Sequence, residues 1–328
     1  MEKDRNSNLP WVERFRPQNI DEMISHDSAR STIEKLIEKN CLPHLLFYGP
    51  PGTGKTTMAH AIATKLYGKQ KQQMVLELNA SDDRGINIIR EQVKRFSSTR
   101  TIFGTGHKLI ILDESDAMTN PAQAALRRIM EKYSSNVRFI LICNYPEKLI
   151  PALRSRCTEF RFPPLPHEDA KIYLEKVAQQ VGLEYVDSGI NALLSLGNGD
   201  LRRSLNLMQT TAMATNVINE SNVYKCAGYP EPEQIKTQLD GLLNQPLESS
   251  VKALNQLRIE KGYALLDILR ELHRQAILIE FEPLVLANLI DNLAQIEKRI
   301  AEGANEAIET AALAAAFQVT RIELDKNQ

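Results

Sequence analysis

The stretch Gly49-Pro50-Pro51-Gly52-Thr53-Gly54-Lys55-Thr56 decides the fold of this chain. It has the pattern G-x-x-x-x-G-K-[ST], follows an apolar run at residues 44–48 and precedes a helical pattern, which is the context that a phosphate-binding loop requires. That context disfavours the alternative, a chance glycine-rich turn. The glycines let backbone N–H groups wrap phosphates, and the helix N-terminus adds positive potential. The sequence therefore predicts a site for Mg-ATP.

Two side chains of the loop have specific expected contacts. Lys55 should reach the β- and γ-phosphates, and the hydroxyl of Thr56 should bind Mg²⁺. The predicted nucleotide-binding residues of the loop are Gly49, Pro50, Pro51, Gly52, Thr53, Gly54, Lys55, Thr56 and Thr57. The expected cofactors are ATP and Mg²⁺.

Short apolar runs alternate with amphipathic segments through the first half of the chain. Such runs, separated by helices, are typical of a parallel sheet that is covered on both faces. The predicted strands lie at residues 44–48, 74–78, 108–112, 137–142 and, with a weaker pattern, 158–162. Between two of them, Asn120 is expected to cap a helix that begins at Pro121. The predicted fold class is therefore α/β.

An acidic pair follows the third predicted strand. Asp113 and Glu114 lie at the carboxyl end of an apolar run, which is where open α/β sheets bind ligands. Alone, such a pair more often caps a helix, but the phosphate-binding loop favours a catalytic role. Asp113 should hold Mg²⁺ through water, and Glu114 should orient or deprotonate the attacking water. After the next strand, Asn144 can hydrogen-bond the γ-phosphate or that water.

Proline clusters divide the chain into three predicted domains. Pro163, Pro164 and Pro166 end the sheet region, and a second break at residues 229–232 opens a last, almost entirely helical region. We expect a nucleotide-binding domain at residues 1–164 and helical domains at 165–229 and 230–328. In the last domain, Leu265, Leu266, Ile268, Leu269 and Leu272 fit core packing and subunit contact equally well.

The composition excludes several classes of protein. The chain has 328 residues, of which 43% are hydrophobic and 25% charged, as in ordinary soluble globular proteins. The formal net charge is -1, so any DNA contact has to come from a local basic patch. The four cysteines form no C-x-x-C pair, which argues against a zinc site. No signal-peptide core and no apolar run of about 20 residues is found, so we expect an intracellular, soluble protein.

Several further motifs, in a fixed order, identify a family. The chain resembles the small subunits of replication factor C, the clamp loader of eukaryotes and archaea, over nearly its whole length. The motifs are PWVERFRP at residues 10–17, ELNASDDRGI at 77–86, SRC at 155–157 and GDLRR at 199–203. Residues 314–321, AAAFQVTR, resemble one particular eukaryotic small subunit. The resemblance implies an AAA+ domain followed by a helical lid and an all-α C-terminal collar that joins the subunits.

The resemblance also implies roles for individual residues. Val12, Arg16 and Ile24 should line the adenine and ribose pocket. Arg202 should approach the γ-phosphate from the lid of the same subunit. Arg156 should act in trans, as an arginine finger on the neighbouring subunit's ATP. The implied catalytic residues are Lys55, Glu114, Asn144 and Arg156, and a lone subunit should hydrolyse ATP slowly.

Two departures from the family pattern are visible. The third position of the acidic box is Ser115, where alanine is usual, and a small serine should preserve the function of the acidic pair. After Ile24, Ser25-His26 replaces the usual glycine-glutamine, which puts the details of the adenine contact in doubt.

A local basic patch lies between residues 84 and 108. Arg90 and Lys94 are four residues apart and so share one helix face, and Arg84 precedes them. Composition alone favours an ordinary solvated helix face. The resemblance instead implies that Arg84, Arg90 and Lys94 follow the DNA backbone, a contact that gives affinity without sequence preference.

The predicted function is that of an ATP-hydrolysing subunit of a pentameric clamp loader. Its implied partners are a large subunit, three other small subunits, the sliding clamp (PCNA) and primer-template DNA, and its implied location is the nucleus. One alternative is a ring member that binds ATP but turns over little of it. Another is an AAA+ remodelling motor, which the polar and basic residues 81–85 disfavour because such motors use aromatic-hydrophobic pore loops.

Overall fold

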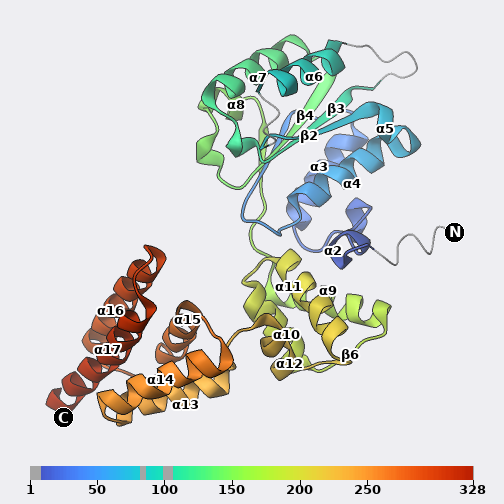
Figure 1. The fold of residues 1–328 in the computed structure, drawn as a ribbon. Helices are drawn as coiled ribbons and strands as arrows, with labels where there is room; N and C mark the ends of the chain where they lie inside the picture. The colour runs from blue at the N-terminus through green and yellow to red at the C-terminus, as the bar shows by residue number, and fades with distance from the viewer. Residues whose placement is uncertain (1–8, 82–85, 99–105, 328) are drawn as a thin grey trace. The chain divides into compact units, whose positions relative to one another are not determined.

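A five-stranded parallel sheet forms the centre of the nucleotide-binding region (Figure 1). This computed structural model describes residues 9–81, 86–98 and 106–327, with side chains of the helix at 86–98 described from Glu91 onward. The strand order is β2-β3-β4-β1-β5. The strands are β1 Leu45–Tyr48, β2 Val75–Asn79, β3 Lys108–Asp113, β4 Val137–Cys143 and β5 Thr158–Arg161. All five predicted strands are confirmed, and so is the α/β class.

Helices cover both faces of this sheet (Figure 1). Their bounds are α3 Asp27–Glu38, α4 Lys55–Tyr67, α5 Lys71–Met74, α6 Ile86–Ser98, α7 Asn120–Lys132 and α8 Pro151–Arg154. The short helix α2 Trp11–Arg14 precedes them in the N-terminal segment. Four short 3₁₀ helices are η1 Ile20–Glu22, η2 Gly68–Gln70, η3 Ser115–Ala117 and η4 Pro146–Lys148. The predicted cap at Asn120 is wrong by one residue, because Thr119 has the extended backbone of an N-cap and Asn120 is already helical.

Alternate residues of the central strands β1, β3 and β4 face opposite layers of the core. On one side, Phe47 of β1 and Ile111 of β3 pack with Ile62 of α4. On the other side, Leu46 and Leu112 pack with Met130 of α7. Because successive side chains of a strand point to opposite faces, a strand that is buried on both faces must be apolar throughout. That requirement explains the continuous apolar runs in the sequence.

The parallel arrangement brings the ends of three strands to one edge of the sheet. β1 pairs with β4 and β4 pairs with β3, so Tyr48, Cys143 and Asp113 end neighbouring strands that run in the same direction. The phosphate-binding loop follows β1, the acidic pair follows β3, and Asn144 follows β4. The candidate residues therefore converge at this edge although they are widely separated in the sequence.

The remaining elements are mostly helical. They are α9 His167–Val181, β6 Glu184–Tyr185, α10 Asp187–Gly197, α11 Leu201–Ala214, β7 Val217–Ile218 and α12 Glu220–Ala227, followed by α13 Pro232–Asn244, α14 Leu247–Lys261, α15 Leu265–Ala276, α16 Pro283–Ala301 and α17 Glu306–Asn327. The chain divides into two compact units, Met1–Gln209 and Thr210–Gln328. The first unit contains the sheet together with α9, α10 and the start of α11.

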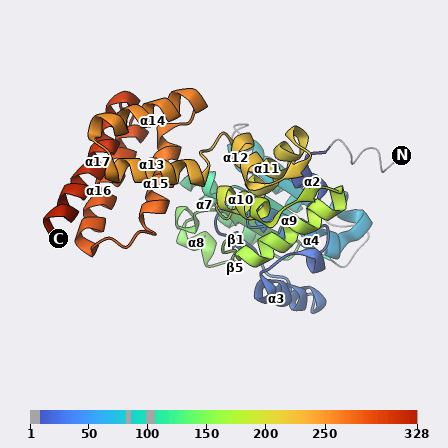
Figure 2. The ribbon, with the colours of Figure 1, turned by 90° about the horizontal axis from the view of Figure 1, so that it is seen from below.

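The helices α13 to α17 of the second unit pack together around their own apolar core (Figures 1 and 2). The apolar positions of α15 contribute to it: Leu265, Ile268, Leu269 and Leu272 are buried, whereas Leu266 is half-buried. Core packing therefore accounts for four of the five apolar positions of α15 that the sequence had left undecided. Within the described residues, no helix has both the length and the apolar character needed to cross a membrane.

A substitution at the centre of the sheet tests this core. Phe139 on β4 is fully buried, and Phe139→Ala should lower the free energy of unfolding by about 3–5 kcal/mol, because it removes buried surface and leaves a cavity. Ile172→Ala on α9, where the side chain is 61% exposed, is the matched control and should change it by less than about 0.5 kcal/mol. Thermal unfolding of both variants is the measurement. Equal losses would contradict the assignment of Phe139 to the core.

Candidate nucleotide-binding site

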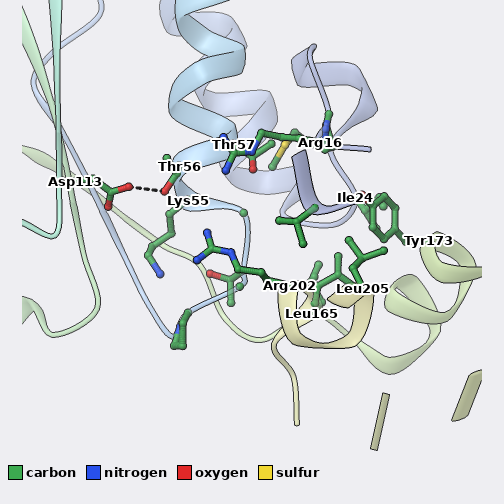
Figure 3. Close-up of a pocket in the computed structure, with 18 of the residues that line it drawn as sticks. Arg16, Ile24, Lys55, Thr56, Thr57, Asp113, Leu165, Tyr173, Arg202 and Leu205 are labelled. Atoms are coloured by element: carbon green, nitrogen blue, oxygen red, sulfur yellow. Dashed lines mark hydrogen bonds between the residues drawn. The ribbon is translucent and has the colours of Figure 1, made fainter. Parts of the chain in front are cut away.

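A pocket opens at the carboxyl edge of the sheet in the first unit (Figure 3). Four parts of the chain line it: the N-terminal segment, the phosphate-binding loop, the strand ends and the helices that follow the sheet. The lining residues are Val12, Arg16, Pro17, Met23, Ile24, Pro51, Gly52, Thr53, Gly54, Lys55, Thr56, Thr57, Asp113, Glu114, Asn144, Leu165, Tyr173, Leu201, Arg202 and Leu205. Most of the residues predicted for the ATP site are therefore brought together in one cavity.

The phosphate-binding loop wraps around the side chain of Lys55. Nζ of Lys55 donates hydrogen bonds to the carbonyl oxygens of Gly49 and Pro50, each at 2.7 Å. Gly49 and Pro50 thus contact the amino group of Lys55 through their carbonyl oxygens, but they do not line the cavity. Burial lowers the pKa of Lys55, while the nearby carboxylate of Asp113 raises it. Gly54 ends the loop, and Lys55 is the first residue of α4, so the free N–H groups at the start of α4 point toward the cavity.

Two oxygen-bearing side chains that suit Mg²⁺ lie side by side. The hydroxyl of Thr56 donates to Oδ2 of Asp113 at 2.8 Å (Figure 3). Magnesium prefers hydroxyl, carboxylate and water oxygens, so this pair fits the predicted ion. The backbone N–H of Glu114 donates to the other oxygen of Asp113 at 2.8 Å. This contact holds the carboxylate in place at the end of β3.

Glu114 turns the chain sharply after β3. Its φ of 52° lies in the left-handed region, which is uncommon for a residue other than glycine and occurs often at functional sites. The residue lines the cavity next to Asp113, as the catalytic interpretation of the acidic pair requires. The substitution at Ser115 is harmless to this geometry, because its buried hydroxyl donates to the carbonyl of Leu112 at 2.8 Å.

The turn that contains Asn144 is held by Asp116 of η3, the 3₁₀ helix that follows β3. The backbone N–H groups of Asn144 and Tyr145 donate to Oδ2 of Asp116 at 3.2 and 3.1 Å. Asp116, the last residue of the acidic box, therefore positions the turn after β4. Asp116 had no predicted role, although its place three residues after Asp113 was the available signal.

Apolar side chains form the other end of the cavity. Ile24, Leu165, Tyr173 and Leu205 lie together in Figure 3, away from Thr56 and Asp113. Such a surface is suited to a nucleobase. Val12, Arg16 and Ile24 were predicted here, whereas Pro17, Met23, Leu165, Tyr173, Leu201 and Leu205 were missed. The four-residue spacing of Leu201 and Leu205, which puts them on one helix face, was the signal that could have found two of them.

The N-terminal segment is tied to the helices that follow the sheet. The hydroxyl of Tyr173 on α9 donates to the carbonyl of Phe15 at 2.8 Å, and burial raises the pKa of Tyr173 to about 12. The backbone N–H of Trp11 donates to Oε1 of Gln209 at 3.0 Å. These two contacts hold the N-terminal segment, which contributes Val12 and Arg16 to the cavity, against α9 and α11.

The unusual Ser25-His26 dipeptide makes its own contact with the loop. Both residues have positive φ angles, 65° and 63°. Nε2 of His26 lies 3.1 Å from the carbonyl oxygen of Thr53 and so donates to it. The His26 ring also packs edge-on against Phe162, and burial lowers the pKa of the imidazole. A neutral His26 therefore joins the segment after Ile24 to the phosphate-binding loop.

Arg202 enters the cavity from the start of α11. The carboxylate of Asp200 accepts the backbone N–H of Arg202 at 2.9 Å and that of Arg203 at 3.3 Å, so it caps this helix. The same carboxylate touches the phosphate-binding loop, because a Cβ built on Gly52 would lie 1.9 Å from its Oδ1. Asp200 thus positions the start of α11, and with it Arg202, relative to the phosphate-binding loop.

Arg156 is not part of this cavity. It lies in the turn between α8 and β5 and forms an ion pair with Glu131 of its own chain. Of the three predicted DNA-contacting residues, Lys94 is exposed on α6. Arg84 and the side chain of Arg90 fall outside the described residues, so their predicted role stays untested.

Comparison with known proteins agrees with the class that the fold and site define, a P-loop ATPase of the AAA type. The ATPase family associated with various cellular activities (AAA) matches residues 45–165. The replication factor C C-terminal domain matches residues 230–316. The chain is 50% identical over 315 residues to human replication factor C subunit 5, covering 96% of this chain and 93% of that protein. It is 43% identical over 327 residues to replication factor C subunit 3 of Saccharomyces cerevisiae, covering 97% and 96%.

The chain therefore belongs to the replication factor C family, that is, to the AAA+ ATPase subunits of clamp loaders. The predicted resemblance to the subunit called third in yeast and fifth in humans is confirmed. Among solved structures, the Holliday junction branch migration motor RuvB of Thermotoga maritima is similar, with a TM-score of 0.54, 18% identity and coverage of 82% of this chain and 93% of that one. Identity this low shows the shared fold alone.

The contact between Asp200 and Gly52 can be tested by adding one methyl group. Gly52→Ala should weaken ATP binding at least about tenfold, because the new Cβ collides with the carboxylate and the left-handed φ of 72° strains alanine. Gly182→Ala is the matched control: φ is 77° and nothing lies within 4 Å of the added atom. Titration with a fluorescent ATP analogue is the measurement. Comparable weakening in both variants would contradict the close contact.

Proposed function

We propose that this chain binds Mg-ATP in the cavity and hydrolyses it with the help of a neighbouring subunit. Hydrolysis would serve to open the sliding clamp and load it onto primer-template DNA during replication and repair. One observation carries the proposal: Lys55, Asp113 and Glu114 line the cavity together with Asn144 and Arg202, whereas Arg156 lies outside it. The arrangement suits an active site that is completed between subunits.

Each side chain has a role that follows from its place. Thr56 and Asp113 would hold Mg²⁺, which neutralises the charge that develops on the phosphates. Lys55 would leave its two carbonyl partners to bind the β- and γ-phosphates. Glu114 would orient or deprotonate the attacking water, since it lies next to Asp113 at the phosphate end of the cavity. Asn144 and Arg202 would contact the γ-phosphate from opposite sides.

Arg156 would act on the ATP of the next subunit. A guanidinium group has the planar geometry and permanent charge suited to phosphate oxygens. Its side chain is 37% exposed and belongs to the outer turn between α8 and β5, so a neighbouring molecule can reach it. A lone subunit would then hydrolyse ATP slowly, because its own site lacks an arginine finger.

The assembly would contain a large subunit and three other small subunits besides this chain. We assign residues 1–164 to the AAA+ domain, 165–229 to the lid and 230–328 to the collar that joins the subunits. Arg84, Arg90 and Lys94 would follow the DNA backbone, the clamp would be PCNA, and the site of action would be the nucleus. The family membership of the chain supports each of these finer assignments.

Glu114→Gln tests catalysis at this site. The substitution keeps the shape of the side chain but removes its ability to accept a proton, so turnover should fall at least about 10²-fold while ATP affinity stays within about threefold. Hydrolysis is measured in an assembled ring in which the other catalytic sites are inactivated. Glu147→Gln, an exposed carboxylate on η4 outside the cavity, is the control. Normal turnover in the Glu114 variant would exclude this role and favour a purely structural use of ATP.

Arg156→Ala tests the action in trans. ATP hydrolysis that is stimulated by clamp and primed DNA should fall, with a loss of about 10³-fold or more at the site that receives the arginine. ATP binding to this chain's own cavity should not change. Arg154→Ala removes a nearby arginine with the same side-chain exposure, at the end of α8, one that pairs with Glu159, and should have little effect. An unchanged rate in the Arg156 variant would remove this residue from the active site.

A further inference from the structure

The guanidinium of Arg156 is held at two points within its own chain. Nη2 lies 2.5 Å from Oε1 of Glu131 on α7, and Nη1 donates to the carbonyl of Ala152 on α8 at 2.6 Å. The helices α7 and α8 pack against each other, so the two acceptors belong to one framework. A long, flexible side chain is thereby fixed in one direction.

Glu131 is itself held by a second cation. Nε of Arg127, one helical turn earlier on α7, lies 3.7 Å from the same carboxylate oxygen. This Nε is buried and has no hydrogen-bond partner. The carboxylate of Glu131 therefore lies between two guanidinium groups, and its attraction to Arg127 favours the orientation in which it also meets Arg156.

The pairing leaves Arg156 able to bind a phosphate. A guanidinium carries five N–H donors, and two of them are used by Glu131 and Ala152, which leaves three. The side chain can thus keep both contacts and still donate to an anion on its outer edge. Two observations, a fixed guanidinium and free donors, describe a preorganised group.

We propose that Glu131 is a positioning residue for Arg156. Its carboxylate, together with the Ala152 carbonyl, holds the guanidinium in the direction that meets the neighbouring subunit's nucleotide. An arginine that is already oriented loses less rotamer freedom when it contacts the phosphate, and small errors in the placement of a catalytic group are costly in rate. The inference rests on the proposed action of Arg156 in trans.

The negative charge of Glu131 also has an electrostatic effect of opposite sign, and this gives the test its direction. A carboxylate beside the arginine adds negative charge near the incoming phosphate, so its removal could raise affinity or rate by simple electrostatics. Positioning predicts a fall in turnover, whereas charge repulsion predicts a rise.

The first experiment measures the ATPase rate of the assembled ring, stimulated by clamp and primed DNA, with Glu131→Ala in this chain. The part of the rate that depends on Arg156 should fall by about 3- to 30-fold. The fall should appear mainly in kcat, with KM little changed, because the substitution removes the orientation of a catalytic group and not a contact with the substrate. Glu131→Gln should restore much of this rate, because its amide oxygen still accepts from Nη2. Both partners are exposed by more than a third, so neither substitution should reduce thermal stability or ring assembly appreciably.

A double substitution separates positioning from a general structural effect. In the Arg156→Ala background, Glu131→Ala should cause no further loss, because a residue that acts through Arg156 has nothing left to position. Glu159→Ala is the matched control, since it breaks a nearby, similarly exposed ion pair, the one between Glu159 of β5 and Arg154 of α8. It should leave the rate within about twofold.

The outcomes distinguish this inference from the proposed function. If Arg156→Ala lowers the rate but Glu131→Ala does not, or raises it, the positioning role is overturned and the trans action of Arg156 stands. An additive loss in the double variant also overturns the positioning role. If Arg156→Ala itself has no effect, both ideas are overturned.

Discussion

The direction of the sheet strands is the constraint on which the rest of this site depends. Because β1, β3 and β4 are parallel neighbours, their carboxyl ends meet at one edge, and each is followed by a loop that carries polar groups. The hydrogen bond from Thr56 to Asp113 joins two of these ends directly. It places the start of α4, with its unpaired N–H groups, beside an acidic pair, which is the combination that a metal-bound triphosphate requires.

The cavity is completed by contacts between segments that are far apart in the sequence. Tyr173 binds the carbonyl of Phe15, and Gln209 binds the N–H of Trp11. His26 donates to Thr53, and the carboxylate of Asp200 lies against Gly52. These contacts connect the N-terminal segment, the phosphate-binding loop and the start of α11. Asp200 both caps α11 and lies against the loop.

The candidate catalytic residues fall into two groups. Lys55, Glu114 and Asn144 line the cavity, while Arg156 lies outside it and pairs with Glu131 of α7. Under the proposed action of Arg156 in trans, a ring of such subunits would couple hydrolysis to assembly, because each site would need a correctly placed neighbour. The ion pair with Glu131 would orient Arg156 before the neighbour arrives.

Sequence alone determined the strands, the phosphate-binding loop, the acidic pair and Asn144, because these depend on local patterns: apolar runs of strand length, glycines at fixed spacing and polar residues at strand ends. It also indicated the family, which the comparisons confirm. The cap before α7 was misplaced by one residue, at Asn120 instead of Thr119, which is a local error. The sequence also missed Leu165 and Tyr173 in the cavity and the contacts of Asp116, Asp200 and Glu131. Those depend on which distant segments pack together, and a hydrogen bond between residues 158 positions apart, such as that of Tyr173 with Phe15, has no local signature. Only the tertiary structure decided these contacts, because the packing of helices against the sheet determines which distant side chains lie next to one another.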